Sequence, residues 1–310
     1  MVKYVIKRIL QLIPTLFLVS VIVFLMVRII PGDPITLLYG LSESGGASEE
    51  YLDAMREQYG LNDPLIVQYI RWITGFMHGD MGTSLFTHKT ILTELTNRYQ
   101  YTIILAVGGT VVGSLIGVIC GIIAAVYHNK AGDNIVMVIS MVAVSLPSFF
   151  LAMLLMLYFC LYLRILPSLG LRSWKHAILP ITTLGLGAIG MIARTTRSSM
   201  LDVMNQDYIR TARAYGTSKY KIVMKHAFKN ALIPVLTAIG LRFGSLLAGS
   251  ALVETIFTIP GIGSFLVDSV NKRDYPAIQS TVLVLAASFV IVNTLVDILY
   301  GFVDPRVKYE

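Results

Sequence analysis

Charged residues are scarce in this chain. Asp, Glu, Lys and Arg make up only 14% of its 310 residues, whereas they make up about a quarter of an average soluble domain. Hydrophobic residues account for 55%, and the mean hydropathy is +0.71. This composition excludes an ordinary soluble domain and predicts an integral membrane protein.

Cysteine and the common catalytic motifs are also scarce. Cys120 and Cys160 both lie inside apolar runs, where a free cysteine behaves as a small hydrophobic residue. The five histidines are scattered, and the sequence contains no phosphate-binding loop, paired-histidine zinc motif or nucleophile turn. We therefore predict no catalytic residues, no metal ligands and no cofactor bound by this chain.

The net charge of +7 does not indicate a nucleic-acid partner. Basic residues do not alternate with exposed aromatic ones, and the apolar runs leave little soluble surface. Instead, residues 194–230 concentrate eight basic and only two acidic residues between two apolar runs. Such loops lie on the cytoplasmic side, which also places both chain termini in the cytoplasm when spans are counted from there.

Six apolar runs are long enough to cross the bilayer as helices, so the predicted fold is an all-α membrane protein. The first resembles a signal peptide, but its apolar core is longer and no small-residue cleavage site follows, so we predict that it is retained. Three regions result: residues 1–30 (N-terminus and first span), 31–100 (an acidic extracytoplasmic segment) and 101–310 (the remaining spans). The predicted spans cover residues 9–27, 101–126, 135–163, 177–193, 232–253 and 277–302.

Local signals add detail to the acidic segment. Ser48 is a plausible N-cap and Gly60 a plausible C-terminal residue for a short helix. A second helix is expected after Asp63-Pro64, and its aromatic stripe, which includes Tyr69 and Trp72, is typical of a membrane interface.

Glycines recur at helical spacing in three spans. Gly240 and Gly244 share one helix face, and Gly185-Leu-Gly-Ala-Ile-Gly190 matches the dinucleotide-binding pattern only formally, because it lies in the middle of an apolar run. We interpret all three sets as faces for close helix packing. The longest set is a ladder in the second span, formed by Gly109, Gly113, Gly117 and Gly121.

A few polar or helix-breaking residues inside the spans are candidates for a translocation path. Pro147 should kink the third span, which would serve either an aqueous path or simple packing. Arg242 should reach the interface, pair, or face water, and Asp297 should pair locally or relay protons. The path candidates are Ser145, Pro147, Gly240, Arg242 and Gly244.

Nine short motifs occur in order along the chain, and together they resemble a known family. They are Pro31-Gly-Asp-Pro34, Tyr59-Gly-Leu-Asn-Asp-Pro-Leu65, Gly79-Asp-Met-Gly82, Tyr208-Ile-Arg-Thr-Ala-Arg-Ala-Tyr-Gly216, His226-Ala-Phe-Lys-Asn-Ala-Leu-Ile-Pro234, Glu254-Thr-Ile-Phe257, Pro260-Gly-Ile-Gly263, Arg273-Asp-Tyr-Pro276 and Asp304-Pro-Arg306. The set resembles the B-type permease subunit of bacterial dipeptide, oligopeptide, glutathione and nickel ABC importers.

The resemblance implies a type I importer in the bacterial cytoplasmic membrane. Its other parts would be a homologous second permease, two cytosolic ATPases that bind ATP and Mg, and an extracytoplasmic substrate-binding protein. The substrate would be a di- or oligopeptide or a glutathione-like peptide, with nickel or a metal chelate as the alternative. A secondary transporter is the alternative from another class, but it needs intramembrane ionisable groups and usually an internal repeat.

Within this family, the stretch from Gln206 to Thr217 would be the helix that couples the permease to the ATPase. Ala212 and Ala214 would allow close approach, Gly216 would permit a tight chain reversal, and Arg210 and Arg213 would pair with acidic groups. Arg210 replaces the glutamate of many importers, as is typical of the peptide branch. The implied coupling residues are Asp207, Arg210, Thr211, Ala212, Arg213, Ala214, Tyr215 and Gly216.

Overall fold

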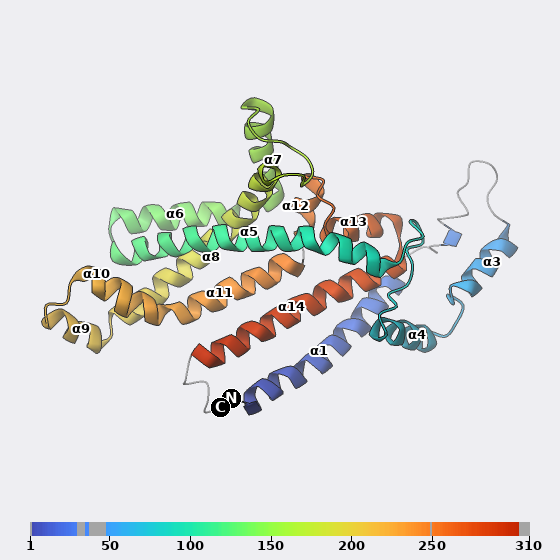
Figure 1. Ribbon diagram of the computed structural model, residues 1–310, viewed down its shortest axis with the longest axis horizontal. Coiled ribbons are helices and arrows are strands. Elements are labelled where there is room, and N and C mark those ends of the chain that lie inside the picture. Colours follow the sequence, from blue (N-terminus) through green and yellow to red (C-terminus); the bar gives the residue numbers. More distant parts are fainter. Residues whose placement is uncertain (1, 30–34, 37–47, 249, 304–310) are drawn as a thin grey trace.

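The computed structural model describes residues 2–29, 35–36, 48–248 and 250–303 of the chain. These residues are largely helical, and their β pairing is limited to one antiparallel bridge between Thr83 and Thr90. The motifs Pro31-Gly-Asp-Pro34 and Asp304-Pro-Arg306 lie outside the described residues. Long helices run side by side in an elongated bundle (Figure 1).

Five described helices are long and apolar enough to cross a membrane. They are α1 (Val2–Ile29), α5 (Ile91–Val126), α8 (Trp174–Met204), α14 (Tyr275–Val303), and the continuous helix formed by α10 (Lys219–Lys221), the π-helical η2 (Ile222–Phe228) and α11 (Lys229–Ala248). A sixth span is counted if α6 (Ala131–Ser145) is joined to the segment formed by α7 (Ser148–Met156) and η1 (Leu157–Tyr162). These two parts meet at an angle of 96°.

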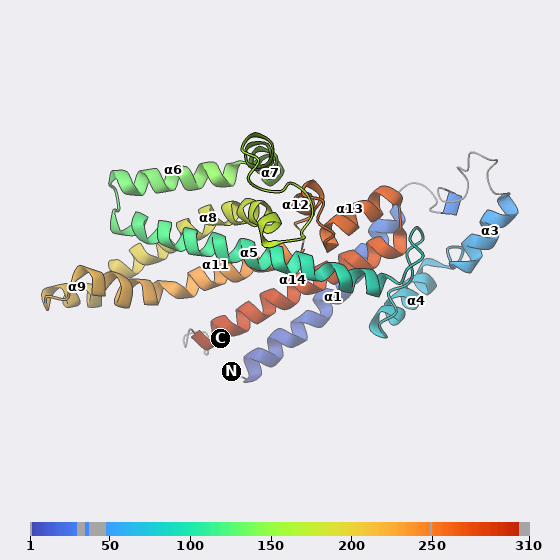
Figure 2. The same ribbon diagram turned by 45° about the horizontal axis from the view of Figure 1, so that its top comes forward.

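Six spans are predicted, and the described residues contain five, or six when the bent pair is counted as one span. Several boundaries also differ. The third is broken at Pro147, so α7 projects sideways from the bundle in both views (Figures 1 and 2). The fourth was predicted to end at residue 193, but α8 continues as a helix to Met204. Between the last two predicted spans the chain forms two short helices, α12 (Ala251–Ile256) and α13 (Ile262–Lys272).

The α5 glycine ladder lies against α8, as predicted. A β-carbon on Gly113 would lie 2.6 Å from Cβ of Ala188, and one on Gly121 would lie 2.5 Å from Cβ of Thr196. Real β-carbons do not approach this closely, so only glycine lets the two backbones come together here. Because membrane helices associate mainly through packing and hydrogen bonds, this contact holds together the two central helices of the bundle.

The other predicted glycine faces also mediate close packing. Gly240 of α11 lies against Val296 of α14, and Gly244 lies beside Asn293, whose Oδ1 is 3.0 Å from where a β-carbon would stand. Gly190 of α8 lies against the backbone of α6 at Ser140. The dinucleotide-like pattern is therefore a helix-packing face.

A buried carboxylate joins three helices near the end of the bundle that carries α12 and α13. Glu254 is fully buried and accepts hydrogen bonds from the hydroxyls of Thr102 and Ser250 and from the backbone N–H of Ser264, each at 2.9 Å. The Thr102 oxygen accepts a further hydrogen bond from the N–H of Ile262 at 3.0 Å. Three donors on one carboxylate compensate for its loss of water.

A second buried carboxylate fixes the loop before α5 to α14. Asp274 precedes the first residue of α14 and accepts a hydrogen bond from the Ala277 N–H at 3.4 Å, as an N-cap does. It also accepts hydrogen bonds from the Ser84 hydroxyl and from the Leu85 N–H. The loop is therefore attached to the start of the last span.

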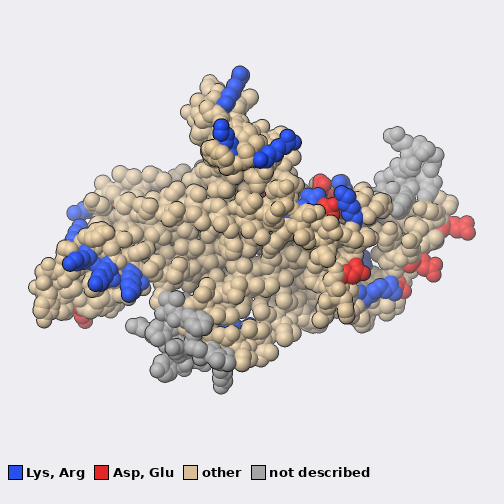
Figure 3. Space-filling model, viewed as in Figure 1, with Lys and Arg blue, Asp and Glu red and all other residues tan. Residues whose placement is uncertain are grey.

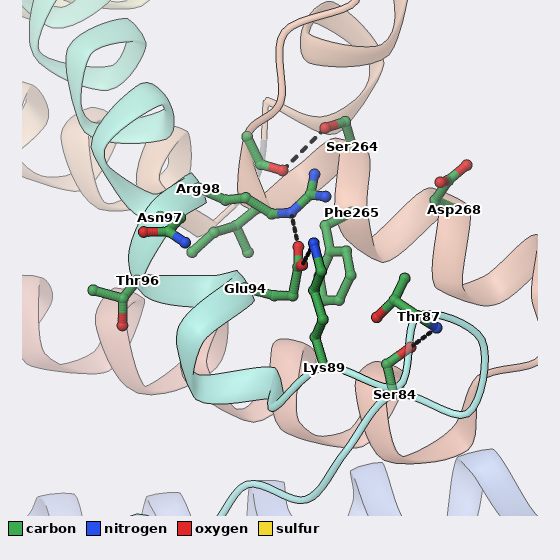
Figure 4. Close-up of polar contacts among 12 residues, drawn as sticks. Ser84, Thr87, Lys89, Glu94, Thr96, Asn97, Arg98, Ser264, Phe265 and Asp268 are labelled. Carbon is green, nitrogen blue, oxygen red and sulfur yellow. Dashed lines mark hydrogen bonds and ion pairs between the residues drawn. The ribbon is translucent and has the colours of Figure 1, made fainter.

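The beginning of α5 is attached to α13 by charged side chains. Figure 4 shows Glu94 between Lys89 and Arg98, with nitrogen-to-oxygen distances of 3.6 Å and 2.9 Å. The guanidinium of Arg98 lies over the ring of Phe265 of α13, 4.7 Å from its centre, in a cation–π contact.

The segment before α5 folds much as predicted. α3 (Glu49–Gln58) begins after Ser48, whose hydroxyl oxygen accepts the Tyr51 N–H at 3.3 Å. The aromatic stripe of α4 (Leu65–Met77) packs on α1, because Tyr69 and Trp72 lie with their ring centres 5.4 Å and 6.2 Å from that of Phe24. This stripe therefore serves as a helix contact.

We expect Gly113→Val to weaken the α5–α8 contact. The new side chain would overlap Ala188 and the Gly185 carbonyl, and overpacking of this kind costs about 1–3 kcal/mol or more. The melting temperature of the purified subunit should fall. Val111→Phe is the matched control because Val111 is 50% exposed on the same helix, and an equal loss in both variants would contradict the packing role of Gly113.

Glu254→Gln should also destabilise the protein. A glutamine is neutral and has one acceptor oxygen instead of two, so the hydrogen bonds to this side chain lose the charge that strengthens them, at a cost of about 1–3 kcal/mol. The melting temperature should fall, and further in Glu254→Ala. Glu57→Gln, which alters an exposed glutamate of α3, is the control and should leave the melting temperature unchanged. An unchanged melting temperature in Glu254→Gln would contradict the proposed hydrogen-bond network.

Candidate functional site

The predicted coupling stretch forms a short helix at one end of the bundle. α9 (Asp207–Ala214) follows the end of α8 and precedes α10 (Figure 1). It ends because Gly216 adopts a left-handed conformation with φ of +74°, which costs glycine no steric strain. The Thr217 N–H then bonds back to the Ala212 carbonyl at 3.1 Å, closing the chain reversal expected from the sequence.

α9 has one inward side and a broad exposed surface. Ile209 is fully buried and Ala212, one helical turn later, is half-buried. Ala212 therefore lies nearer the inward side of α9 and Ala214 is exposed, and the part that both play in coupling stays a prediction. The exposed candidates are Asp207, Arg210, Thr211, Arg213, Ala214, Tyr215 and Gly216.

Side-chain contacts attach α9 to the rest of the chain and leave its cations accessible. Asn230 of α11 donates a hydrogen bond to the Tyr208 hydroxyl at 2.8 Å. Arg210 lies 3.6 Å from Asp207 in an exposed pair, and such pairs contribute at most about 1 kcal/mol. Figure 3 shows a group of Lys and Arg near this end of the bundle, further ones around α7 and toward the opposite end, and most acidic residues near α3 and α4.

A buried ion pair supports the helix that leads into α9. Arg197 of α8 donates two hydrogen bonds to Asp133 of α6, both 2.6 Å long. Asp133 is 2% exposed and also accepts the Asn129 N–H at 3.0 Å. The sequence analysis placed Arg197 in the basic stretch between two spans and did not predict this pair, because 64 residues separate its partners.

The break between α6 and α7 lies beside a pocket that contains Arg242. The pocket has a volume of about 300 Å³ and is lined by Leu146, Ser148, Thr183, Gly187, Arg242 and Ser245, among others. Ser145 and Pro147 form the break itself, and the Ser145 hydroxyl donates to the Met141 carbonyl at 2.8 Å.

Arg242 lacks an acidic partner among the described residues. Its Nη2 donates to the Leu184 carbonyl at 3.4 Å, and its Nε has no hydrogen-bond partner within the described part of the chain. Arg242 therefore lines a pocket without an acidic partner in the described part of the chain, and its exposure to a water-filled path stays a prediction.

The remaining candidates within the spans make local contacts. Gly240 and Gly244 pack α11 against α14, and their place in a translocation path stays a prediction. Asp297 of α14 pairs with Arg8 of α1 at 3.0 Å, which is the local pairing expected from the sequence.

Comparison with protein families gives two matches that together cover nearly the whole chain. Residues 117–309 match the model for the binding-protein-dependent transport system inner membrane component. Residues 1–106 match the model for the N-terminal part of the binding-protein-dependent transport system membrane component.

Individual proteins and solved structures agree with this assignment. The chain is 44% identical over 310 residues, covering all of both chains, to the glutathione transport system permease protein GsiC of Salmonella paratyphi A (strain ATCC 9150 / SARB42) and to that of Escherichia coli (strain K12). Two inward-facing structures of the MetNI methionine ABC transporter superpose with TM-scores of 0.57 and 0.60, at 19% and 18% identity, over 68% of this chain and 96% of theirs. They show the same fold.

Both family matches and the full-length relatives describe one class of membrane protein. Its members are non-catalytic, multi-pass inner-membrane subunits, and ATP is hydrolysed by a separate subunit. The chain belongs to the family of binding-protein-dependent transport system inner membrane components and is a permease subunit of an ABC importer.

Proposed function

We propose that this chain imports glutathione or small peptides, together with a homologous second permease, by alternating access. The observation that carries this proposal is its 44% identity over the full length to glutathione permeases. In the proposed orientation, the α9 end and both termini face the cytoplasm, where the basic residues between spans concentrate. The α3 and α4 end then faces the binding protein.

In this proposal, α9 transmits the ATPase cycle to the membrane. Its exposed surface would bind one of two cytosolic ATPases, which themselves bind ATP and Mg. Arg210 and Arg213 would pair with acidic groups of that ATPase. Because α8 leads directly into α9 and the Tyr208–Asn230 hydrogen bond ties α9 to α11, a displacement of α9 moves both helices. The Asp133–Arg197 pair carries the displacement of α8 on to α6.

The translocation path would pass the pocket beside the break between α6 and α7. Arg242 is the charged residue of this pocket, and a guanidinium binds carboxylates with charge-assisted hydrogen bonds. Peptides and glutathione carry carboxylates, whereas an arginine repels a nickel cation. The pocket therefore favours a peptide over a bare nickel cation.

Ala214→Asp should uncouple transport from ATP hydrolysis. Ala214 is exposed on α9, so a carboxylate there alters the surface offered to the ATPase without disturbing packing within the chain. We expect ATP-dependent uptake to fall at least tenfold while the melting temperature of the subunit stays unchanged. Ala131→Asp, at an exposed helix start near the same end, is the control, and normal uptake by Ala214→Asp would refute the coupling assignment.

Arg242→Gln should lower glutathione uptake about tenfold or more. A hydrogen bond to a charged group contributes about 1.5–3 kcal/mol, and 1.4 kcal/mol corresponds to a factor of ten. Arg242→Lys should retain part of the activity because it keeps the charge. Basal ATPase activity of the assembled importer serves as the folding control, and equal uptake in wild type and Arg242→Gln would exclude Arg242 from the path.

A further inference from the structure

A second pocket lies near the other end of the bundle, between the end of α1, α4, the loop after α4 and the start of α14. Its volume is about 230 Å³, and its lining includes Arg28, Gln68, Trp72, Asp80, Tyr275 and Gln279. One water takes up about 30 Å³ of liquid, so this pocket can hold a group several times larger. It is separate from the pocket of Arg242, with which it shares no lining residue.

Four residues of this lining carry buried polar atoms without a hydrogen-bond partner within the described part of the chain. The atoms are Nε of Arg28, Oε1 of Gln68, Nε1 of Trp72 and Nε2 of Gln279. Gln68 and Gln279 are only 8% and 4% exposed. A buried polar atom without a hydrogen-bond partner destabilises the fold, and native proteins rarely leave one unpaired. Four unpaired polar atoms around one pocket indicate that a bound ligand supplies their hydrogen-bond partners.

Three of the four atoms are hydrogen-bond donors, and one belongs to a cation. Arg28 forms no ion pair with a described residue, and its guanidinium is held between two rings, 5.1 Å from the centre of Phe24 and 5.7 Å from that of Tyr275. A positioned guanidinium beside indole and amide N–H groups suits an oxyanion. The acceptors Gln68 Oε1 and Asp80 suit an ammonium group on the same ligand.

We propose that this pocket binds a zwitterion, with its carboxylate or phosphate toward Arg28, Trp72 and Gln279 and its ammonium group toward Gln68 and Asp80. The pocket lies where the α1 span ends, which is the depth of lipid headgroups. α4 next to it exposes apolar side chains, with Ile66 73% exposed and Met77 80% exposed. The zwitterion is therefore a phosphatidylethanolamine headgroup or a soluble small peptide.

Measurements on the purified importer in nanodiscs test both possible sources of the zwitterion, lipid and soluble peptide. One arm measures the melting temperature in discs of phosphatidylethanolamine against discs of a phosphate-free glycolipid, and native mass spectrometry counts retained phospholipid. The other arm adds glycylglycine to the glycolipid discs. The pocket variants are Arg28→Gln and Gln279→Leu. The control is Arg98→Gln, because Arg98 and its partner Glu94 both lie outside the pocket.

We expect either phosphatidylethanolamine or glycylglycine to raise the melting temperature of wild type and of Arg98→Gln by several degrees. Arg28→Gln and Gln279→Leu should each lose at least half of that rise or retain at least fivefold less phospholipid. If Arg28→Gln does not fold, the comparison of Gln279→Leu with wild type and Arg98→Gln decides the test. If neither arm separates the pocket variants from wild type and Arg98→Gln, the pocket binds no zwitterion and the inference is wrong.

Discussion

Close contact between α5 and α8 is the constraint on which the other helices depend. Helices in a bilayer gain little from the hydrophobic effect when they meet, so close packing has to hold them together. The ladder that includes Gly113 and Gly117 brings the two backbones into contact. α6 then packs on α8 at Gly190, and α13 attaches to α5 through Thr102.

Buried polar groups fix both ends of this framework, and the pocket of Arg242 lies between them. Near α12 and α13, Glu254 joins three helices through neutral donors. Toward α9, the Asp133–Arg197 pair joins α6 to α8. Removing one partner of a buried ion pair costs about 3–5 kcal/mol, so in the proposed mechanism α6 would move with α8 when α9 is displaced. The 96° turn at Pro147 is where this framework meets the pocket.

Local and periodic signals made much of the fold predictable from sequence. The glycine faces, the break at Pro147 and the N-cap Ser48 all depend on neighbours within one or two helical turns. The polar networks were not predictable, because Thr102 and Glu254 are 152 residues apart. The end of α8 was misplaced because Arg197 looked like a loop residue. Arg197 in fact lies within α8, where it pairs with Asp133 of α6. The part that Ala212 plays in coupling stays a prediction, because a small residue suits either side of α9.

The central claim is that this subunit is moved by ATPases that it does not itself contain. Isolation of the chain from its native host through a C-terminal tag, followed by mass spectrometry of bound proteins, tests this claim most directly. The account predicts recovery of a homologous permease and ABC ATPases, with the substrate-binding protein captured in the presence of substrate. Recovery of the folded chain alone, with uptake unaffected by ATP depletion, would contradict it and indicate a secondary transporter.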